Sequence, residues 1–220
     1  DQLLISLLKP ERLLEMVRLY TLFDKKAGKI VARYQQIFGI KRLIERISTK
    51  NSNGGREGGV IWHTTGSGKS FTMVFLSKAL ILHEALKQCR ILVVTDRVDL
   101  EDQLSKTFVS GGELAGKKDK QNAMATSGKR LAEQIGKGTE RIMFSLIQKF
   151  NSATKLPECV NTSSDFIVLI DEGHRSQGGE NHVRMKLALP NAAFVAFTGT
   201  PLLKDEKTVN KFGPIVHAYT

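Results

Sequence analysis

The sequence is poor in cysteine and has no long hydrophobic run. Its two cysteines, Cys89 and Cys159, lie far apart and outside any CxxC pattern. This arrangement excludes a disulfide framework and gives no zinc site, so we expect two free thiols in a reducing compartment. No apolar run reaches the length that crosses a bilayer. Because Lys9, Glu11 and Arg12 interrupt the apolar start, no secretory signal is expected, and we predict a cytoplasmic protein without membrane contact.

Acidic residues are too few to balance the basic ones. The chain has 33 Lys and Arg against 22 Asp and Glu, a formal net charge of +11, and the sequence pI is about 9.7. This excess favours a polyanionic partner, nucleic acid first and an anionic membrane surface second. A merely soluble basic protein is the alternative. Apolar residues make up 41% of the chain, which is enough for a buried core and excludes wholesale disorder.

The pattern of apolar residues changes near residue 50. Before it, leucines and isoleucines recur at helical spacing and predict amphipathic helices, one of them over about 30–47. An Asn- and Gly-rich loop follows at 51–59. From residue 60 onward, short apolar runs alternate with helical patterns, which is typical of a parallel sheet covered by helices on both faces. We therefore predict an α/β fold, with 1–50 as a helical linker and 51–220 as the main domain.

The individual elements of this domain can be placed from the same patterns. The predicted strands are 60–62, 90–95, 141–144, 166–170 and 192–197. The predicted helices are 69–86, 99–107, 127–136 and 181–189. The Gly- and Lys-rich segment 111–120 predicts a surface loop.

A glycine-rich turn, HTTGSGKS, runs from His63 to Ser70 between a predicted strand and helix. Such a turn bares backbone N–H groups at a helix N-terminus, where an anion is favoured. Lys69 can reach the β- and γ-phosphates, and the Ser70 hydroxyl can hold Mg²⁺. The turn predicts a nucleotide-binding P-loop, although His63 stands where the pattern has its first glycine. The expected nucleotide-binding residues are Thr64, Thr65, Gly66, Ser67, Gly68, Lys69 and Ser70.

An acidic motif, Asp171-Glu172-Gly173-His174, directly follows the strand predicted at 166–170. Ligands of a parallel sheet sit beyond the carboxyl ends of its strands, so this motif should lie at the same edge as the P-loop. There Asp171 can bind Mg²⁺, and Glu172 can orient and deprotonate an attacking water. His174 can hydrogen-bond to a neighbouring motif. The expected catalytic residues are Lys69, Asp171, Glu172 and His174, and the expected metal ligands are Ser70 and Asp171.

A third motif, Thr198-Gly199-Thr200-Pro201, follows the strand predicted at 192–197. Thr198 and Thr200 can hydrogen-bond the His174 region and so couple hydrolysis to another element. As a turn the motif is otherwise ordinary, because Gly and Pro occur in many loops.

These three motifs, in this order, resemble motifs I, II and III of superfamily 2 helicases and translocases. More narrowly, the chain resembles the motor part of the restriction subunit of type I restriction-modification enzymes, in which a histidine at the position of His63 is typical. The resemblance spans nearly the whole chain. It is carried by segments 10–14, 32–36, 61–70, 94–103, 147–150, 171–175 and 197–201.

The resemblance implies an adenine-binding motif before the P-loop. Tyr34-Gln35-Gln36 is similar to the Q-motif, and a glutamine amide can both donate to and accept from the adenine edge. The family more often shows Tyr-His-Gln, which favours Gln36, but adjacent glutamines leave the choice open. An exposed polar helix face is the alternative.

The resemblance also implies DNA-facing residues at two other strand ends. Thr95 and Arg97 lie in what resembles motif Ia, and Gln148 and Lys149 in what resembles the next DNA-facing motif. Ordinary surface polarity is the alternative for all four.

A RecA-like P-loop NTPase lobe is the fold that the resemblance implies. ATP and Mg²⁺ are the implied cofactors, and double-stranded DNA and the modification and specificity subunits are the implied partners. In such motors a second lobe brings arginine to the γ-phosphate, and these residues do not include it, so we expect ATP binding, weak hydrolysis and no DNA cleavage. The alternatives are another superfamily 2 motor, or a nucleotide-gated DNA-binding module without turnover.

Overall fold

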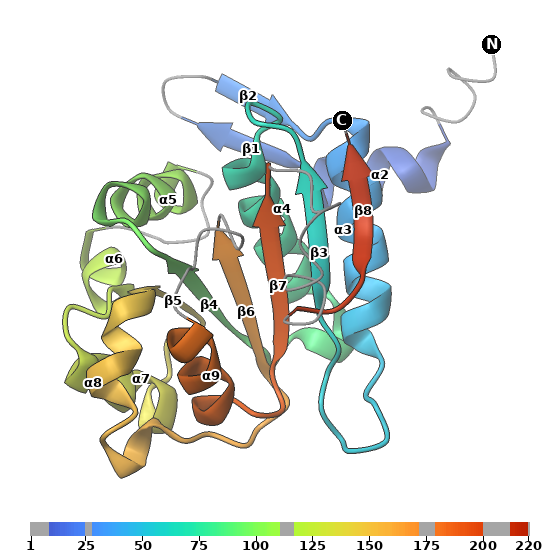
Figure 1. Cartoon of the computed structure of the whole chain (residues 1–220). Helices are drawn as coiled ribbons and strands as arrows, with labels where there is room; N and C mark the ends of the chain where they lie inside the picture. Colours follow the sequence, from blue (N-terminus) through green and yellow to red (C-terminus); the bar gives the residue numbers. More distant parts are fainter. Residues whose placement is uncertain (1–8, 25–27, 111–116, 172–178, 200–211, 220) are drawn as a thin grey trace.

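Six parallel strands form the centre of the molecule (Figure 1). The computed structural model describes residues 9–24, 28–110, 117–171, 179–199 and 212–219. Within these ranges the strand order is β5-β4-β6-β7-β3-β8, with every neighbouring pair parallel. The strands are β3 (Gly59–His63), β4 (Arg90–Thr95), β5 (Ile142–Leu146), β6 (Phe166–Asp171), β7 (Ala193–Thr198) and β8 (Ile215–Tyr219).

Helices cover both faces of this sheet (Figure 1). Side chains alternate along a strand, so Ile61 joins the buried cluster beneath α3, α4 and α5, whereas Val60 joins the cluster beneath α7, α8 and α9. None of the helices in the described ranges is both long and apolar enough to cross a membrane. The helices are α2 (Pro10–Leu19), α3 (Tyr34–Ser48), α4 (Lys69–Leu82), α5 (Val98–Ser110), α6 (Lys117–Ala123), α7 (Gly128–Lys137), α8 (Phe150–Ala153) and α9 (Gly179–Ala188).

The α/β fold predicted from the sequence is confirmed. Each of the five strands predicted from residue 60 onward is present, with its bounds shifted by at most two residues. The helix predicted at 69–86 ends earlier, at Leu82, and a short 3-10 helix at Glu84–Leu86 follows.

The prediction that residues 1–50 are helical is wrong for part of that segment. An antiparallel hairpin, β1 (Thr21–Asp24) and β2 (Gly28–Val31), separates α2 from α3. In β1, Thr21 and Leu22 are buried and Phe23 is exposed, and in β2 only Ile30 is partly buried. Ile30 continues the helical spacing of the α3 isoleucines, so periodicity alone extended the predicted helix into β2.

Two further elements differ from the sequence-based expectation. The final strand, β8, pairs in parallel with β3 at the edge of the sheet, and no strand was predicted there. The segment 111–120 was predicted as a loop, but α6 begins at Lys117, and 111–116 lie outside the described residues. The lysines of this segment suggest a solvated loop, but lysine also has a favourable helix propensity and is compatible with an exposed helix.

Candidate nucleotide-binding site

The turn between β3 and α4 has the backbone geometry of an anion-binding loop. Gly66 and Gly68 have φ angles of 81° and 86°, a region that L side chains rarely adopt. Gly68 is the N-cap of α4, and no side chain caps this helix, so the N–H groups of its first turn are available to an anion. The Nζ atom of Lys69 lies 3.5 Å from the carbonyl oxygen of His63, so the lysine side chain curls back over the turn.

The remaining residues of the predicted P-loop lie on the same turn. Thr65 is exposed, and Thr64 and Ser70 are half-buried. Ser67 is buried, and its N–H donates to the Thr64 carbonyl at 3.1 Å. Its hydroxyl has no hydrogen-bond partner in the described ranges. The structure thus brings the seven predicted residues together, with Ser70 in the first turn of α4.

Gln36, in the first turn of α3, holds the P-loop from the side. Its Nε2 donates to the carbonyl oxygen of Gly68 at 3.1 Å and to Oγ1 of Thr72 at 3.0 Å. Its Oε1 accepts from the N–H of Arg33 at 2.8 Å. Gln35 is also buried, at 1% exposure, but neither of its amide atoms has a hydrogen-bond partner within the described part of the chain. The two glutamines, of which the family pattern favours Gln36 without deciding the choice, therefore differ in their surroundings.

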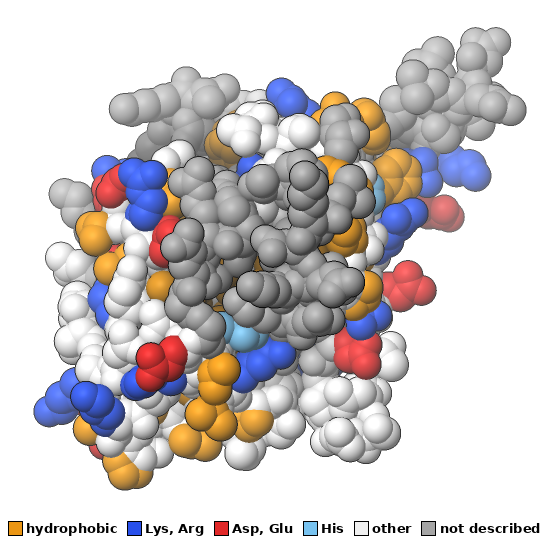
Figure 2. All heavy atoms as spheres, viewed as in Figure 1, with side chains coloured by type: hydrophobic (Ala, Val, Ile, Leu, Met, Phe, Trp, Pro, Cys, Tyr) orange, Lys and Arg blue, Asp and Glu red, His pale blue; other side chains and the backbone are white. Residues whose placement is uncertain are grey.

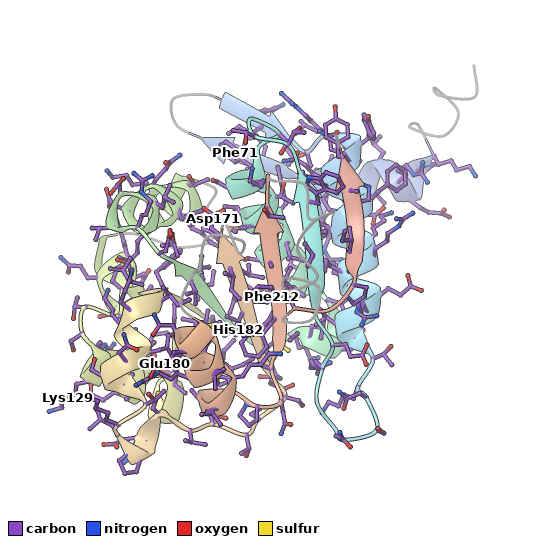
Figure 3. All side chains as sticks on the ribbon, viewed as in Figure 1. Phe71, Lys129, Asp171, Glu180, His182 and Phe212 are labelled. Carbon is purple, nitrogen blue, oxygen red and sulfur yellow. The ribbon has the colours of Figure 1, made fainter. Side chains whose placement is uncertain are left out.

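The acidic motif begins at the same edge of the sheet as the P-loop. Because β6, β7 and β3 are neighbours, Asp171 pairs with Phe197, and Thr198 pairs with Trp62. Two interstrand spacings, about 10 Å, therefore separate β6 from β3. Asp171 is 8% exposed and lies at the tip of β6, at the end of the sheet where Phe71 marks the start of α4 (Figure 3).

The third motif touches the P-loop through Gly199, the residue after β7. A Cβ atom at Gly199 would lie 2.9 Å from Oγ1 of Thr65 and 3.0 Å from Nζ of Lys69. The backbone of Gly199 therefore lies close to both side chains, and a larger residue there would require them to shift. Thr198 is fully buried at the end of β7, and its coupling role stays a prediction. Glu172, His174 and Thr200 lie outside the described residues.

His63 is fully buried directly before the P-loop. Burial first, and then the nearby His217 and Lys69, lower the pKa of its imidazole from the usual 6.5 to about 4. His63 is therefore neutral at pH 7 and adds no charge beside Lys69.

The residues predicted to face DNA after β5 hold two loops together. Nε2 of Gln148 donates to the carbonyl oxygen of Asp96 at 2.8 Å. Nζ of Lys149 lies 3.3 Å from Oε1 of Glu101 on α5, and the two side chains are 17% and 6% exposed. Both contacts join the end of β5 to the segment after β4, so these residues have a structural role whether or not they touch DNA.

The two residues predicted to face DNA after β4 have different exposures. Arg97 is exposed and pairs with Asp99 at 2.6 Å. Thr95 is 2% exposed, and its Oγ1 accepts from the N–H of Arg97 at 3.5 Å. Contact with DNA stays a prediction for both.

Sequence reasoning missed three contributors to this site. Thr72 binds Gln36, and the Tyr219 carbonyl accepts from the N–H of Thr64 at 3.1 Å. His217 hydrogen-bonds His63. The position of Thr72 in the helix after the P-loop could have suggested its role. Nothing in the sequence indicates that β8 pairs with β3, so the contacts of His217 and Tyr219 with the P-loop could not be predicted.

These features define a class of protein: a P-loop NTPase lobe of the helicase type, with an acidic strand end beside the nucleotide-binding turn. The family model described as "SWI2/SNF2 ATPase" matches residues 35–220. The chain belongs to this family.

Curated relatives confirm the resemblance to type I restriction enzymes. Over its whole length the chain is 37% identical to the type I restriction enzyme HindI endonuclease subunit of Haemophilus influenzae. It is 34% identical, again over its whole length, to the putative type I restriction enzyme MjaIXP endonuclease subunit of Methanocaldococcus jannaschii. The chain spans only 22% and 21% of these two proteins.

Solved structures support the fold. The UvsW helicase from bacteriophage T4 matches with a TM-score of 0.62 at 14% identity, over 94% of this chain and 67% of that one. The Sulfolobus solfataricus SWI2/SNF2 ATPase core, solved in complex with dsDNA, matches with a TM-score of 0.61 at 16% identity, over 90% of this chain and 37% of that one. The sheet is thus that of a helicase RecA-like lobe.

Proposed function

We propose that this chain is the ATP-binding motor lobe of a type I restriction endonuclease subunit, in which ATP hydrolysis drives translocation of double-stranded DNA. The observation that carries the proposal is the P-loop turn, with Gly66 and Gly68 in the left-handed region and Lys69 beside Gly199. Membership of an ATPase family supports the chemistry, and the names of the relatives support the restriction system.

The phosphates of ATP would bind to the first turn of α4. Its N–H groups and Lys69 supply hydrogen bonds and positive charge. The oxygens of Ser70 and Asp171 are the hard ligands that Mg²⁺ prefers, and together they leave room for water and phosphate. Mg²⁺ held by these two residues would neutralise part of the charge that develops on the phosphates. We assign the adenine to Gln35, because neither atom of its buried amide has a hydrogen-bond partner among the described residues.

Hydrolysis would need residues beyond this binding turn. Glu172 is proposed to orient and deprotonate the attacking water, and His174 to link it to Thr198 and Thr200 of the third motif. A second lobe, elsewhere in the longer subunit, is proposed to supply arginine to the γ-phosphate. Arginine supplied from outside is often worth about 10³ or more in rate, so these 220 residues should bind ATP and hydrolyse it poorly, without cutting DNA.

Double-stranded DNA and the modification and specificity subunits of the same complex are the proposed partners. The net charge of +11 supports a polyanionic ligand. In Figure 2 the described Lys and Arg side chains stand as separate groups around the rim of the visible face. Contacts from such groups to phosphates would carry no sequence information.

The experiment that tests the proposal measures ATP turnover with and without duplex DNA. It compares this chain with a longer chain that spans both motor lobes. We expect DNA-stimulated turnover in the longer chain, and turnover at least about tenfold lower in this one. Lys69→Ala should reduce turnover of the longer chain by about a hundredfold, because it removes charge from the phosphates.

Lys87→Ala is the matched control, because Lys87 is exposed and its ion pair in the described residues is with exposed Glu84. It should leave turnover unchanged. If the longer chain binds ATP but never turns it over with any DNA, a nucleotide-gated DNA-binding module becomes the better account. Turnover by this chain alone within about tenfold of the longer chain would contradict the split motor.

A further inference from the structure

Strand β8 contacts the start of the P-loop through two of its residues. Nδ1 of His217 lies 2.9 Å from Nε2 of His63, within hydrogen-bond distance. In the register of the two strands, His63 is opposite Tyr219. The carbonyl oxygen of Tyr219 accepts from the N–H of Thr64, the next residue of the turn, at 3.1 Å. One edge strand thus holds two successive residues at the point where β3 becomes the P-loop.

The His63 imidazole is enclosed by aromatic rings. Its ring centroid is 5.1 Å from that of His217 and 6.1 Å from that of Tyr219, both edge-on. The carbonyl oxygen of His63 lies 3.5 Å from Nζ of Lys69. A change in the position of His63 would therefore move both the backbone that enters the turn and a contact of the lysine that reaches the phosphates.

Helix α3 fixes His217 in place from above. A Cβ atom at Gly39 would lie 3.4 Å from Ile61 and 3.5 Å from His217, so the helix backbone runs directly over these two side chains. Nη1 of Arg42, one turn further along α3, donates to the carbonyl oxygen of Val216 at 3.3 Å. Strand β8 is thus tethered to the helix that also carries Gln36.

The P-loop is consequently held at both ends by α3 and β8, which contact each other. Gln36 of α3 binds Gly68 at the end of the turn, and β8 binds His63 and Thr64 at its start. The charged groups beside this pair of imidazoles are Lys69, near His63, and Arg42, near His217. Both are cations, which favours a neutral imidazole pair in which one ring donates and the other accepts.

We propose that His217 is a positioning residue for the nucleotide site: its hydrogen bond to His63 holds the start of the P-loop in the conformation that binds the phosphates. This inference rests on the proposed binding of ATP. It adds that β8, the edge strand of the sheet, contributes to that binding without touching the nucleotide.

The test uses this chain and the dissociation constant of fluorescently labelled ADP. An asparagine amide stands close to the position of Nδ1, whereas a glutamine amide reaches one bond further. We expect His217→Asn to bind within about twofold of the wild type. His217→Ala and His217→Gln should each bind about fivefold more weakly, the effect of one lost hydrogen bond. Because Asn and Gln carry the same amide group, a difference in affinity between the two variants reports the hydrogen bond to His63 rather than the polarity of the side chain.

A spectroscopic measurement separates positioning from folding. The ring-nitrogen ¹⁵N shifts of His63 should change on adding ADP in the wild type and in His217→Asn, and should already be altered without ADP in His217→Gln. His83→Ala, at the end of α4, is the control and should bind like the wild type.

Three results would overturn the inference. His217→Ala could bind as tightly as the wild type, or His217→Asn could bind as weakly as His217→Gln, which would leave no role for the hydrogen bond. Failure of the wild type itself to bind labelled ADP or ATP would refute the proposed nucleotide site, and this inference with it.

Discussion

Gln35 and Gln36 are identical side chains on one helical turn, yet only one of them has partners. Every polar side-chain atom of Gln36 is engaged with the helix start or the P-loop. Gln35 is buried, and among the residues that the structure describes both of its amide atoms are unpaired. Leaving a buried polar group unpaired costs about 1–3 kcal/mol, so a side chain kept in this state is a candidate for binding a ligand. Adenine, which offers both a donor and an acceptor, could satisfy both atoms.

We expect the two alanine variants to have different consequences. Gln35→Ala should weaken ATP about tenfold, with little change for GTP, because it removes a hydrogen bond to the base. Gln36→Ala should weaken ATP and GTP alike and lower the free energy of unfolding by about 2 kcal/mol, because it leaves buried partners unpaired. Nucleotide titration and urea unfolding measure these effects. Loss of base discrimination in Gln36→Ala, with unchanged stability, would reverse the assignment.

At the level of elements, the helices and strands that have a clear local pattern could be predicted from the sequence. Elements and contacts that depend on residues far apart in the chain could not. Strands β4 and β6 are continuous apolar runs, and the P-loop and Asp171 follow strand ends, so both the sheet and its functional edge could be predicted. The hairpin β1–β2 could not, because Ile30 fits a helix and a strand equally well. The partners of the site residues could not either: the contacts of Lys149 with Glu101 and of Gln36 with Thr72 join segments far apart in sequence.

The ion pair between Lys149 and Glu101 joins the end of β5 to α5, and its burial makes it sensitive to single substitutions. Burial raises the pKa of Glu101, while Lys149 opposes that shift. Lys149→Ala would leave an unpaired buried carboxylate, so we expect it to lower the free energy of unfolding by about 3 kcal/mol. Replacing both residues, with Glu101→Gln and Lys149→Met, should recover most of this loss. Urea unfolding at pH 7.5 measures both values.

A matched control for this pair is Arg97→Ala. It breaks a pair in which the arginine and aspartate side chains are 54% and 71% exposed, so it should change stability by less than about 1 kcal/mol.

Duplex binding by the double variant, Glu101→Gln with Lys149→Met, tests the predicted DNA role of Lys149. If binding weakens and becomes less salt-dependent, Lys149 contacts a phosphate; if binding is unchanged, its role is to hold α5.

For the whole molecule, the groups with shifted pKa values make folding sensitive to acid. Burial lowers the pKa of His63 to about 4, so between pH 6.5 and pH 4 the unfolded chain binds a proton that the folded chain does not. Stability from this group is complete above pH 6.5 and is lost as the pH falls. Hydrogen bonds from Lys106 and Lys120 lower the pKa of Asp102 to about 2, so its stabilising contribution is lost in the same direction but at lower pH.

We therefore expect the free energy of unfolding to be nearly constant from pH 8 to pH 6.5 and to fall by about 2 kcal/mol at pH 5, with His63 as the main cause. Urea unfolding at pH 7.5 and pH 5 measures the difference. His63→Gln, which keeps an amide near the position of Nε2 but cannot take up a proton, should make this difference smaller. An equal loss of stability in His63→Gln and the wild type would assign the acid sensitivity to other groups, namely the carboxylates or His217, whose pKa burial also lowers. His63 lies at the start of the P-loop. The same comparison therefore measures how much stability the fold loses in acid because it keeps this imidazole neutral beside the nucleotide site.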